Sequence, residues 1–170
     1  MRENGFTLIE LMVAAGVIAL LAATGTLVLG RTFRSNTSSD NLRVLDTQIN
    51  NLSSLMSSLI RESRVVDLDG VDRQECLDLL QTNGSSLTIE ALDGYLTTYE
   101  LNGADLASNS TILNVSGSTI INNLSFSWTC EDGAPDTVSI LIDAESISED
   151  GGNNVAKTYE FSNYLRNTLN

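Results

Sequence analysis

The chain has 170 residues, a net charge of −13 and no histidine. The length suits one ordinary domain, and the missing histidine excludes a Ser-His-Asp triad, a Cys-His dyad and histidine-ligated metal sites. Walker A and GxGxxG motifs are absent, which argues against a nucleotide site. Nucleic-acid binding needs a basic surface, whereas 20 Asp/Glu and only 6 Lys/Arg follow Arg34. We therefore expect no direct nucleic-acid partner.

An uncharged stretch extends from Leu11 to Gly30. As a helix, a stretch of this length rises about 30 Å, which matches the hydrocarbon core of a bilayer. Basic residues flank it on both sides, so they give a poor indication of its orientation. A secretory signal would have a shorter apolar run, followed by a small-residue cleavage site. The stretch therefore predicts a single membrane-spanning helix.

A single carboxylate, Glu10, lies at the start of this apolar segment. An acidic side chain within a membrane helix costs about 2.5–3.5 kcal/mol or more unless it is paired. Two interpretations remain open. Glu10 is either a helix N-terminal residue at the membrane surface, stabilised by the helix macrodipole, or a residue with a dedicated cationic partner.

The segment Gly5-Phe6-Thr7-Leu8-Ile9-Glu10-Leu11 resembles the cleavage and methylation motif of type IV pilins and type II secretion pseudopilins. The resemblance implies that a prepilin peptidase cuts between Gly5 and Phe6, and that Phe6 is then N-methylated. It also implies that Glu10 pairs with the Phe6 amino group of a neighbouring subunit. The leader departs from the family pattern because it is short and contains Glu3.

An amphipathic pattern follows the apolar stretch. Apolar residues recur at spacings of three and four, at Leu42, Leu45, Ile49, Leu52, Met56 and Leu59. This period predicts a helix with one apolar face. The expected organisation is a leader at 1–5, a membrane half of the helix at 6–30 and an amphipathic half at 31–66.

Alternating apolar and polar residues beyond Arg64 predict strands. The expected strands are Leu87–Ala91, Tyr95–Leu101, Thr111–Val115, Thr119–Trp128, Thr137–Asp143 and Val155–Phe161. The dipeptide Asp93-Gly94 predicts a hairpin between the first two. The prediction is an α+β fold in which a mostly antiparallel sheet of about five to seven strands packs on the amphipathic helix. The resemblance makes this fold pilin-like, with a β-rich head at 67–170 and one globular domain at 31–170.

The order of segments in the head is similar to that of J-type minor pseudopilins and W-type minor pilins, which often have a larger head. The similarity rests on Leu59–Arg64, the strands around Tyr99, Ile121–Phe126, Val138–Ile142 and Tyr159–Asn167. It implies a minor structural subunit near a filament tip, and the alternative is a major pilin that forms the shaft. The implied location is the bacterial inner membrane, with a single membrane pass and a periplasmic head, and then the pilus or pseudopilus. The implied partners are other pilin subunits and the prepilin peptidase.

Two cysteines, Cys76 and Cys130, fall within the expected head. Because the implied periplasmic location is oxidising, we favour a disulfide over two buried free thiols. The bridge would close a loop of about 55 residues, which chain-entropy estimates value at roughly 4 kcal/mol.

Two acidic clusters offer oxygen ligands of the kind that calcium prefers. They are Asp67, Asp69 and Asp72, and then Glu145, Glu149 and Asp150. Neither matches EF-hand spacing, so we expect solvated loops and no cofactor, with the second cluster as a weak calcium candidate. A membrane-anchored enzyme would need a serine nucleophile with Lys157 as its base. No spacing brings Lys157 near a serine, and we do not expect an enzyme.

Overall fold

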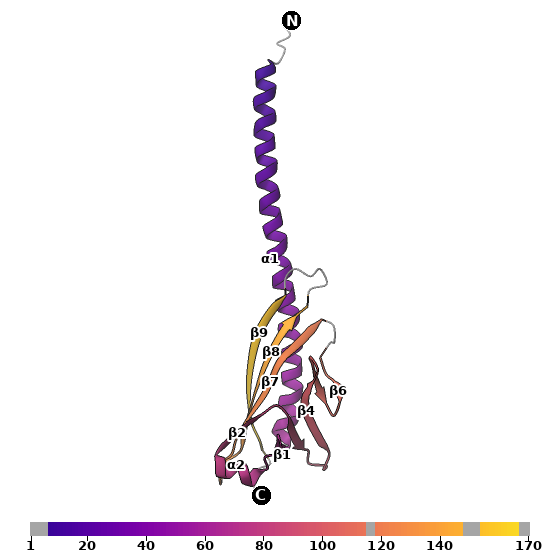
Figure 1. The fold of residues 1–170 in the computed structure, drawn as a ribbon, viewed down its shortest axis with the longest axis vertical. Coiled ribbons are helices and arrows are strands. Elements are labelled where there is room, and N and C mark those ends of the chain that lie inside the picture. Colours follow the sequence, from indigo (N-terminus) through magenta and orange to yellow (C-terminus); the bar gives the residue numbers. More distant parts are fainter. Residues whose placement is uncertain (1–6, 115–117, 148–153, 167–170) are drawn as a thin grey trace. The chain divides into compact units, whose positions relative to one another are not determined.

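Figure 1 shows the computed structural model, which describes residues 7–114, 118–147 and 154–166, with the backbone alone for 33–37. The chain divides into two compact units, Met1–Ser39 and Asp40–Asn170. The long helix α1 spans Leu8–Glu62. It ends earlier than the expected residue 66 because Ser63 satisfies its last carbonyls. The Ser63 amide donates to the Ile60 carbonyl at 3.2 Å, and the Ser63 hydroxyl donates to the Leu59 carbonyl at 2.6 Å.

The described part of the second unit contains nine strands in two antiparallel sheets. The five-stranded sheet has the order β1-β3-β4-β5-β6, at Arg64–Leu68, Leu87–Glu90, Leu96–Asn102, Asp105–Ser108 and Thr111–Ile112. The four-stranded sheet has the order β2-β7-β8-β9, at Gln81–Gly84, Thr119–Thr129, Thr137–Ser146 and Val155–Tyr164. A short helix, α2 (Arg73–Leu79), connects β1 of one sheet to β2 of the other.

The α+β class and the hairpin at Asp93-Gly94 are confirmed. Gly94 has a φ of +82°, and its amide closes the turn on the Ala91 carbonyl between β3 and β4. The expectation of one sheet is wrong, because β1 pairs with β3 whereas β2 pairs with β7. The first two strands of the chain therefore belong to different sheets. The expected strand at Thr111–Val115 forms only at Thr111–Ile112, because Leu113 and Asn114 are not part of a strand, and Val115 lies outside the described residues.

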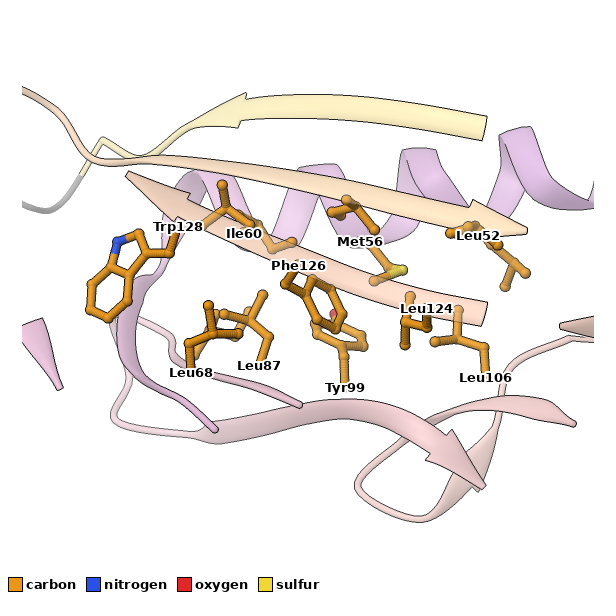
Figure 2. Packing of buried hydrophobic residues seen from close by; sticks show 14 of the residues in the cluster. Leu52, Met56, Ile60, Leu68, Leu87, Tyr99, Leu106, Leu124, Phe126 and Trp128 are labelled. Carbon is orange, nitrogen blue, oxygen red and sulfur yellow. The ribbon is translucent and has the colours of Figure 1, made fainter. Parts of the chain in front are cut away.

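The core of the second unit lies between α1 and the two sheets. The buried stripe of α1 consists of Leu45, Ile49, Leu52, Met56 and Ile60. In Figure 2, Leu52, Met56 and Ile60 face Leu124 and Phe126 of β7, with Tyr99 and Leu106 of the other sheet beyond them. The last expected member of the stripe was Leu59, but this residue is 43% exposed and Ile60 is buried in its place. A spacing of four after Met56 keeps the stripe on one face at 3.6 residues per turn.

Tyr99 is a polar exception in this core. Its side chain is fully buried, and its hydroxyl has no hydrogen-bond partner among the described residues. Burial raises the pKa of the Tyr99 phenol to about 12. The ring therefore serves packing, while its hydroxyl carries a desolvation cost.

Candidate functional site

The N-terminal end of α1 is fixed by two side chains, Thr7 and Glu10. The Glu10 amide donates to the Thr7 hydroxyl oxygen at 3.4 Å, and the Thr7 amide donates to Glu10 Oε2 at 3.1 Å. The Thr7 hydroxyl donates to the same oxygen at 3.0 Å. These reciprocal bonds form a capping box, in which the cap residue and the third helical residue satisfy each other's backbone amides. Thr-x-x-Glu before an apolar run is a sequence signal for this box, which the prediction for Glu10 did not include.

The capping box gives Glu10 a defined position in the single chain. Its carboxylate accepts hydrogen bonds from Thr7 and lies in the first turn of α1, where the helix macrodipole favours negative charge. This geometry corresponds to the first of the two interpretations of Glu10. It leaves the second open, because the cationic partner in that interpretation belongs to another subunit.

The segment that follows is long and apolar enough to cross a membrane. It covers Leu8–Thr32, within α1. Every side chain of this segment is exposed in the single chain. An exposed apolar helix of this length is suited to a lipid environment or to packing against other such helices.

The residues expected to be cleaved and methylated, Gly5 and Phe6, lie outside the described residues. In the sequence they directly precede the capping threonine, Thr7. The predicted cut therefore falls before the capping box, and both members of the box stay in the chain that begins at Phe6.

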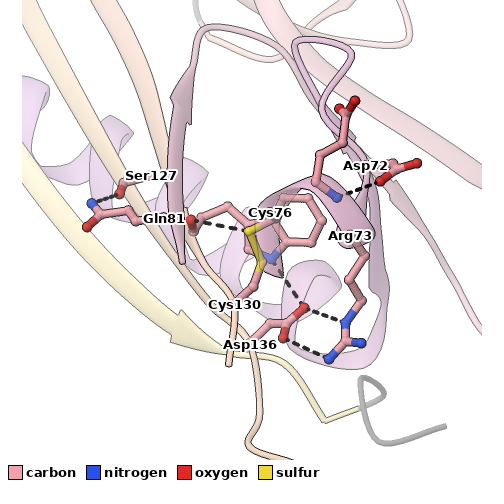
Figure 3. Close-up of a disulfide and its surroundings, with 9 residues drawn as sticks. Asp72, Arg73, Cys76, Gln81, Ser127, Cys130 and Asp136 are labelled. Carbon is pink, nitrogen blue, oxygen red and sulfur yellow. Dashed lines mark hydrogen bonds and ion pairs between the residues drawn. A yellow bond between two sulfur atoms is a disulfide. The ribbon is translucent and has the colours of Figure 1, made fainter. Parts of the chain in front are cut away.

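Cys76 and Cys130 form a disulfide in the head (Figure 3). Cys76 lies on α2, Cys130 follows the end of β7, and their Cα atoms are 5.9 Å apart. Both side chains are almost completely buried. The amide of Cys130 also donates to the Leu80 carbonyl at 3.0 Å. The bridge thus holds the connecting helix α2 against the four-stranded sheet.

A buried carboxylate beside the disulfide was not predicted from the sequence. The Asp136 side chain is fully buried and accepts hydrogen bonds from Trp128 Nε1 at 3.2 Å and from Arg73 at 3.2 and 3.3 Å. Figure 3 shows Arg73 reaching Asp136 from the start of α2. Arg73 is 63 residues from Asp136 in sequence and the three residues fit no motif, so no sequence signal pointed to this cluster. Because each contact joins separate elements, the cluster is a structural anchor of the α2 region.

The carboxylates of the first acidic cluster accept hydrogen bonds from backbone amides of the protein itself. Asp67 accepts from the Gly70 amide at 3.0 Å, and Asp72 caps α2 by accepting from the Glu75 amide at 3.0 Å. Asp69 accepts from the backbone amides of the two serines that follow Gly84, at 2.7 and 2.9 Å. These carboxylates therefore stabilise turns, while Asp69 and Asp72 stay exposed to solvent.

The second acidic cluster is only partly described. Glu145 lies on β8, where it accepts from the Asn122 side chain at 3.3 Å. Glu149 and Asp150 lie outside the described residues. Within the described ranges, no group of three or more Cys, Asp or Glu side chains is arranged to hold a metal ion.

Lys157 is engaged in an ion pair. Its Nζ lies 2.7 Å from Asp46 Oδ1 and 4.9 Å from the centre of the Tyr159 ring. The Tyr159 hydroxyl donates to the same Asp46 oxygen at 2.6 Å. The hydrogen bond from Lys157, followed by that from Tyr159, holds the pKa of Asp46 below its usual 3.8. A lysine engaged in such an ion pair is poorly placed to act as a base, and the three residues instead attach β9 to α1.

A comparison with known families identifies one segment of the chain. The family model of the prokaryotic N-terminal methylation motif matches residues 1–26, which include the capping box and most of the apolar segment. No curated protein and no solved structure matches the chain. The matched motif implies processing by a prepilin peptidase and assembly with other pilin subunits, and it favours a structural subunit over an enzyme. Together with the exposed apolar helix and the antiparallel sheets, it supports a type IV pilin-like family for this chain.

Proposed function

We propose that the chain is a minor structural subunit of a type II secretion pseudopilus or type IV pilus, placed in the complex that initiates the filament or forms its tip. The observation that carries the proposal is the methylation motif at residues 1–26, which continues into an apolar helix exposed along its whole length. The minor role rests on the similarity of the head's segment order to J-type pseudopilins and W-type minor pilins. A head with its own core and a disulfide suits the periplasm.

In this proposal the precursor is anchored in the inner membrane by residues 6–30, and the leader at 1–5 is removed. Cleavage after Gly5 exposes the α-amino group of Phe6. In a filament, the apolar helices pack together and the carboxylate of Glu10 leaves its solvated position. The Phe6 amino group of a neighbouring subunit then supplies the opposite charge that a carboxylate needs in a dry environment. The pair also selects one axial displacement between subunits, because only that displacement brings the two charges together.

The processing step is tested by Gly5→Val. A bulky side chain at the cleavage position should leave the full-length precursor in the inner membrane, whereas the wild-type chain begins at Phe6. Mass spectrometry of the purified protein measures the N-terminus in both. A control substitution in the leader, Glu3→Gln, should be processed normally. A mature chain beginning at Phe6 in the valine variant would contradict the assigned cut.

The pairing step is tested at Glu10 with two variants. Glu10→Leu removes both the capping bonds and the charge, whereas Glu10→Gln retains a side chain that can complete a capping box and removes only the charge. We expect both to insert and be processed normally, yet to crosslink poorly with neighbouring subunits through cysteines in the membrane helices. If Glu10→Gln crosslinks as wild type does, the residue acts only as a helix cap and the pairing is refuted.

The copy number distinguishes the minor subunit from the major pilin. A shaft protein dominates filaments sheared from cells, and a tip or initiation subunit is a trace component of them. Quantitative mass spectrometry of sheared filaments measures this ratio directly. A chain that makes up most of the filament mass would replace the minor role with the shaft role.

A further inference from the structure

Strand β9 presents an open edge of the four-stranded sheet. In the described part of the chain it pairs with β8 alone, over ten residues and without a shift in register. The strand contains no proline. Natural proteins usually block such an edge with a bulge, a proline or an inward-pointing charge, because its unpaired amides and carbonyls can pair with another chain. The only lysine of β9, Lys157, is held by Asp46.

The register identifies the backbone groups that face outward. The Leu165 amide bonds to the Asp136 carbonyl, so odd-numbered residues of this segment point their amides and carbonyls toward β8. The even-numbered residues of β9 therefore direct theirs away from the sheet. These residues are Ala156, Thr158, Glu160, Ser162 and Tyr164. All five are exposed, so a second strand has access to their backbone.

A polar groove lies between the C-terminal part of this strand and α1. Its volume is about 530 Å³, and its lining includes Ser54, Ser57 and Ser58 of α1 with Ser162 and Asn163 of β9. The Asn163 side chain is only 2% exposed, yet its Nδ2 has no hydrogen-bond partner among the described residues. Nearly all buried polar groups in folded proteins are hydrogen-bonded, so this amide marks a place where an acceptor is missing.

The groove is also a positive site on an acidic body. Arg61 and Arg166 line it together with one carboxylate, Glu62. The two arginines are adjacent, since the Arg166 amide donates to the Arg61 carbonyl at 3.0 Å. Within the described residues neither side chain forms an ion pair, whereas Arg64, Arg73 and Lys157 each pair with a carboxylate.

From this combination we propose that β9 and the groove beside it bind an extended, carboxylate-bearing segment of another subunit, by strand addition. The outward amides and carbonyls of β9 would pair with the backbone of the added strand. Its carboxylate would bind Arg61 and Arg166 at the end of the groove, where bidentate contacts are available. An oxygen of the same strand would accept from Asn163 Nδ2. The filament role proposed above supplies only the source of the segment.

The test uses the full chain in detergent and a defined probe. The probe is a fluorescein-labelled peptide of alternating threonine and valine, about nine residues long and ending in aspartate, to match the length of an ordinary strand. Fluorescence anisotropy should show saturable binding to the wild-type chain. Ser162→Pro removes an outward-facing amide and should weaken binding by about tenfold or more. Arg61→Glu should do the same, whereas Arg43→Glu, at an exposed arginine of α1 outside the groove, should change it by less than about twofold.

A charge exchange separates recognition from loss of folding. A second probe ending in lysine should bind the wild-type chain weakly and the Arg61→Glu variant more tightly, which an unfolded variant would not do. Absence of saturable binding to the wild-type chain, or equal binding by wild type, Ser162→Pro and Arg61→Glu, would overturn the proposal. Because no residue of the methylation motif is altered, this failure would leave the processing and pairing tests at Gly5 and Glu10 unaffected.

Discussion

Removal of the disulfide gives the most quantitative test of the head's architecture. The double variant Cys76→Ala/Cys130→Ala deletes the bridge between α2 and the end of β7 and leaves the other contacts of α2 in place. Alanine avoids introducing a buried hydroxyl at two positions that are almost fully buried. The expected result is a folded but considerably less stable head.

The size of the effect follows from the loop that the bridge closes. The two cysteines are 54 residues apart, and the chain-entropy relation then gives a stabilisation of about 4 kcal/mol at 25 °C. For the unit Asp40–Asn170, the entropy of unfolding is about 0.28 kcal/mol/K at the usual value per residue. The midpoint of thermal unfolding should therefore fall by about 15 °C. The ion pair and indole contact of Asp136 keep α2 attached, so we expect the secondary structure to persist.

The measurement is thermal and urea unfolding of the protein without Met1–Arg34, followed by far-ultraviolet circular dichroism. The wild-type fragment in reductant should unfold at the temperature of the double variant, and reductant should leave the double variant unchanged. A loss of less than about 1 kcal/mol would show that the bridge contributes no more than an ordinary contact. A non-reducing peptide map that found both thiols free in protein taken from the periplasm would refute the bridge itself.

Three further predictions concern individual side chains of the head. Gly84→Ala places a Cβ 2.7 Å from Asp69 Oδ2, which should displace that carboxylate from its backbone amides and lower the free energy of unfolding by about 1–3 kcal/mol in urea titrations. Lys157→Met should lower stability at neutral pH. Because the native pKa of Asp46 lies below its usual 3.8, the difference from wild type should shrink as the pH falls below about 4 and through the native pKa. Tyr99→Phe removes a buried hydroxyl that has no partner among the described residues, so the midpoint of urea unfolding should stay constant or rise, and a marked fall would show that the hydroxyl is bonded.

The sequence predicted the helix and strands whose apolar residues repeat regularly, over several helical turns or over several two-residue repeats of a strand. The α1 stripe is regular from Leu45 to Met56, and β8 alternates over all ten of its residues. The strand β7 alternates on either side of its bulge, and β9 alternates from Thr158 to Tyr164, so the types of these elements were evident. The prediction failed by one residue at Leu59, because the next residue, Ile60, is apolar as well. Only the packing decides which of them faces the core.

Short polar elements were not predictable in the same way. The strand β2 has the sequence Gln-Thr-Asn-Gly, which resembles a turn, and becomes a strand only because β7 offers it a partner. The first residues of β1 fell within the helix expected to end at residue 66, since Val65 and Leu68 are three residues apart, as on one face of a helix. A bulge between Val65 and Asp67 accommodates this spacing in the strand. Without β1 and β2 the division into two sheets could not be inferred. The cluster around Asp136 depends on that division, because its contacts join elements that only the completed fold brings together.

The capping box makes the two interpretations of Glu10 compatible, since the residue can cap its own helix in the single subunit and pair with a neighbour in the filament. Its hydrogen bonds involve only Thr7 and Glu10, so removal of residues 1–5 would leave every partner in the chain. A single subunit can therefore keep the carboxylate satisfied before and after processing, without a neighbour. Assembly would then exchange neutral donors on the same chain for the cationic Phe6 amino group of another chain. The free energy gained on assembly is then the difference between Glu10 bonded within its own chain and Glu10 paired with a neighbour, and it is smaller than the full cost of an unpaired charge. A small gain of this kind suits an interface that must form in one register and release in others. On this argument Thr7→Ala, which weakens the cap and keeps the charge, should strengthen crosslinking between subunits or leave it unchanged, whereas Glu10→Gln should weaken it. A loss of crosslinking in Thr7→Ala together with wild-type crosslinking in Glu10→Gln would show that helix capping alone determines assembly.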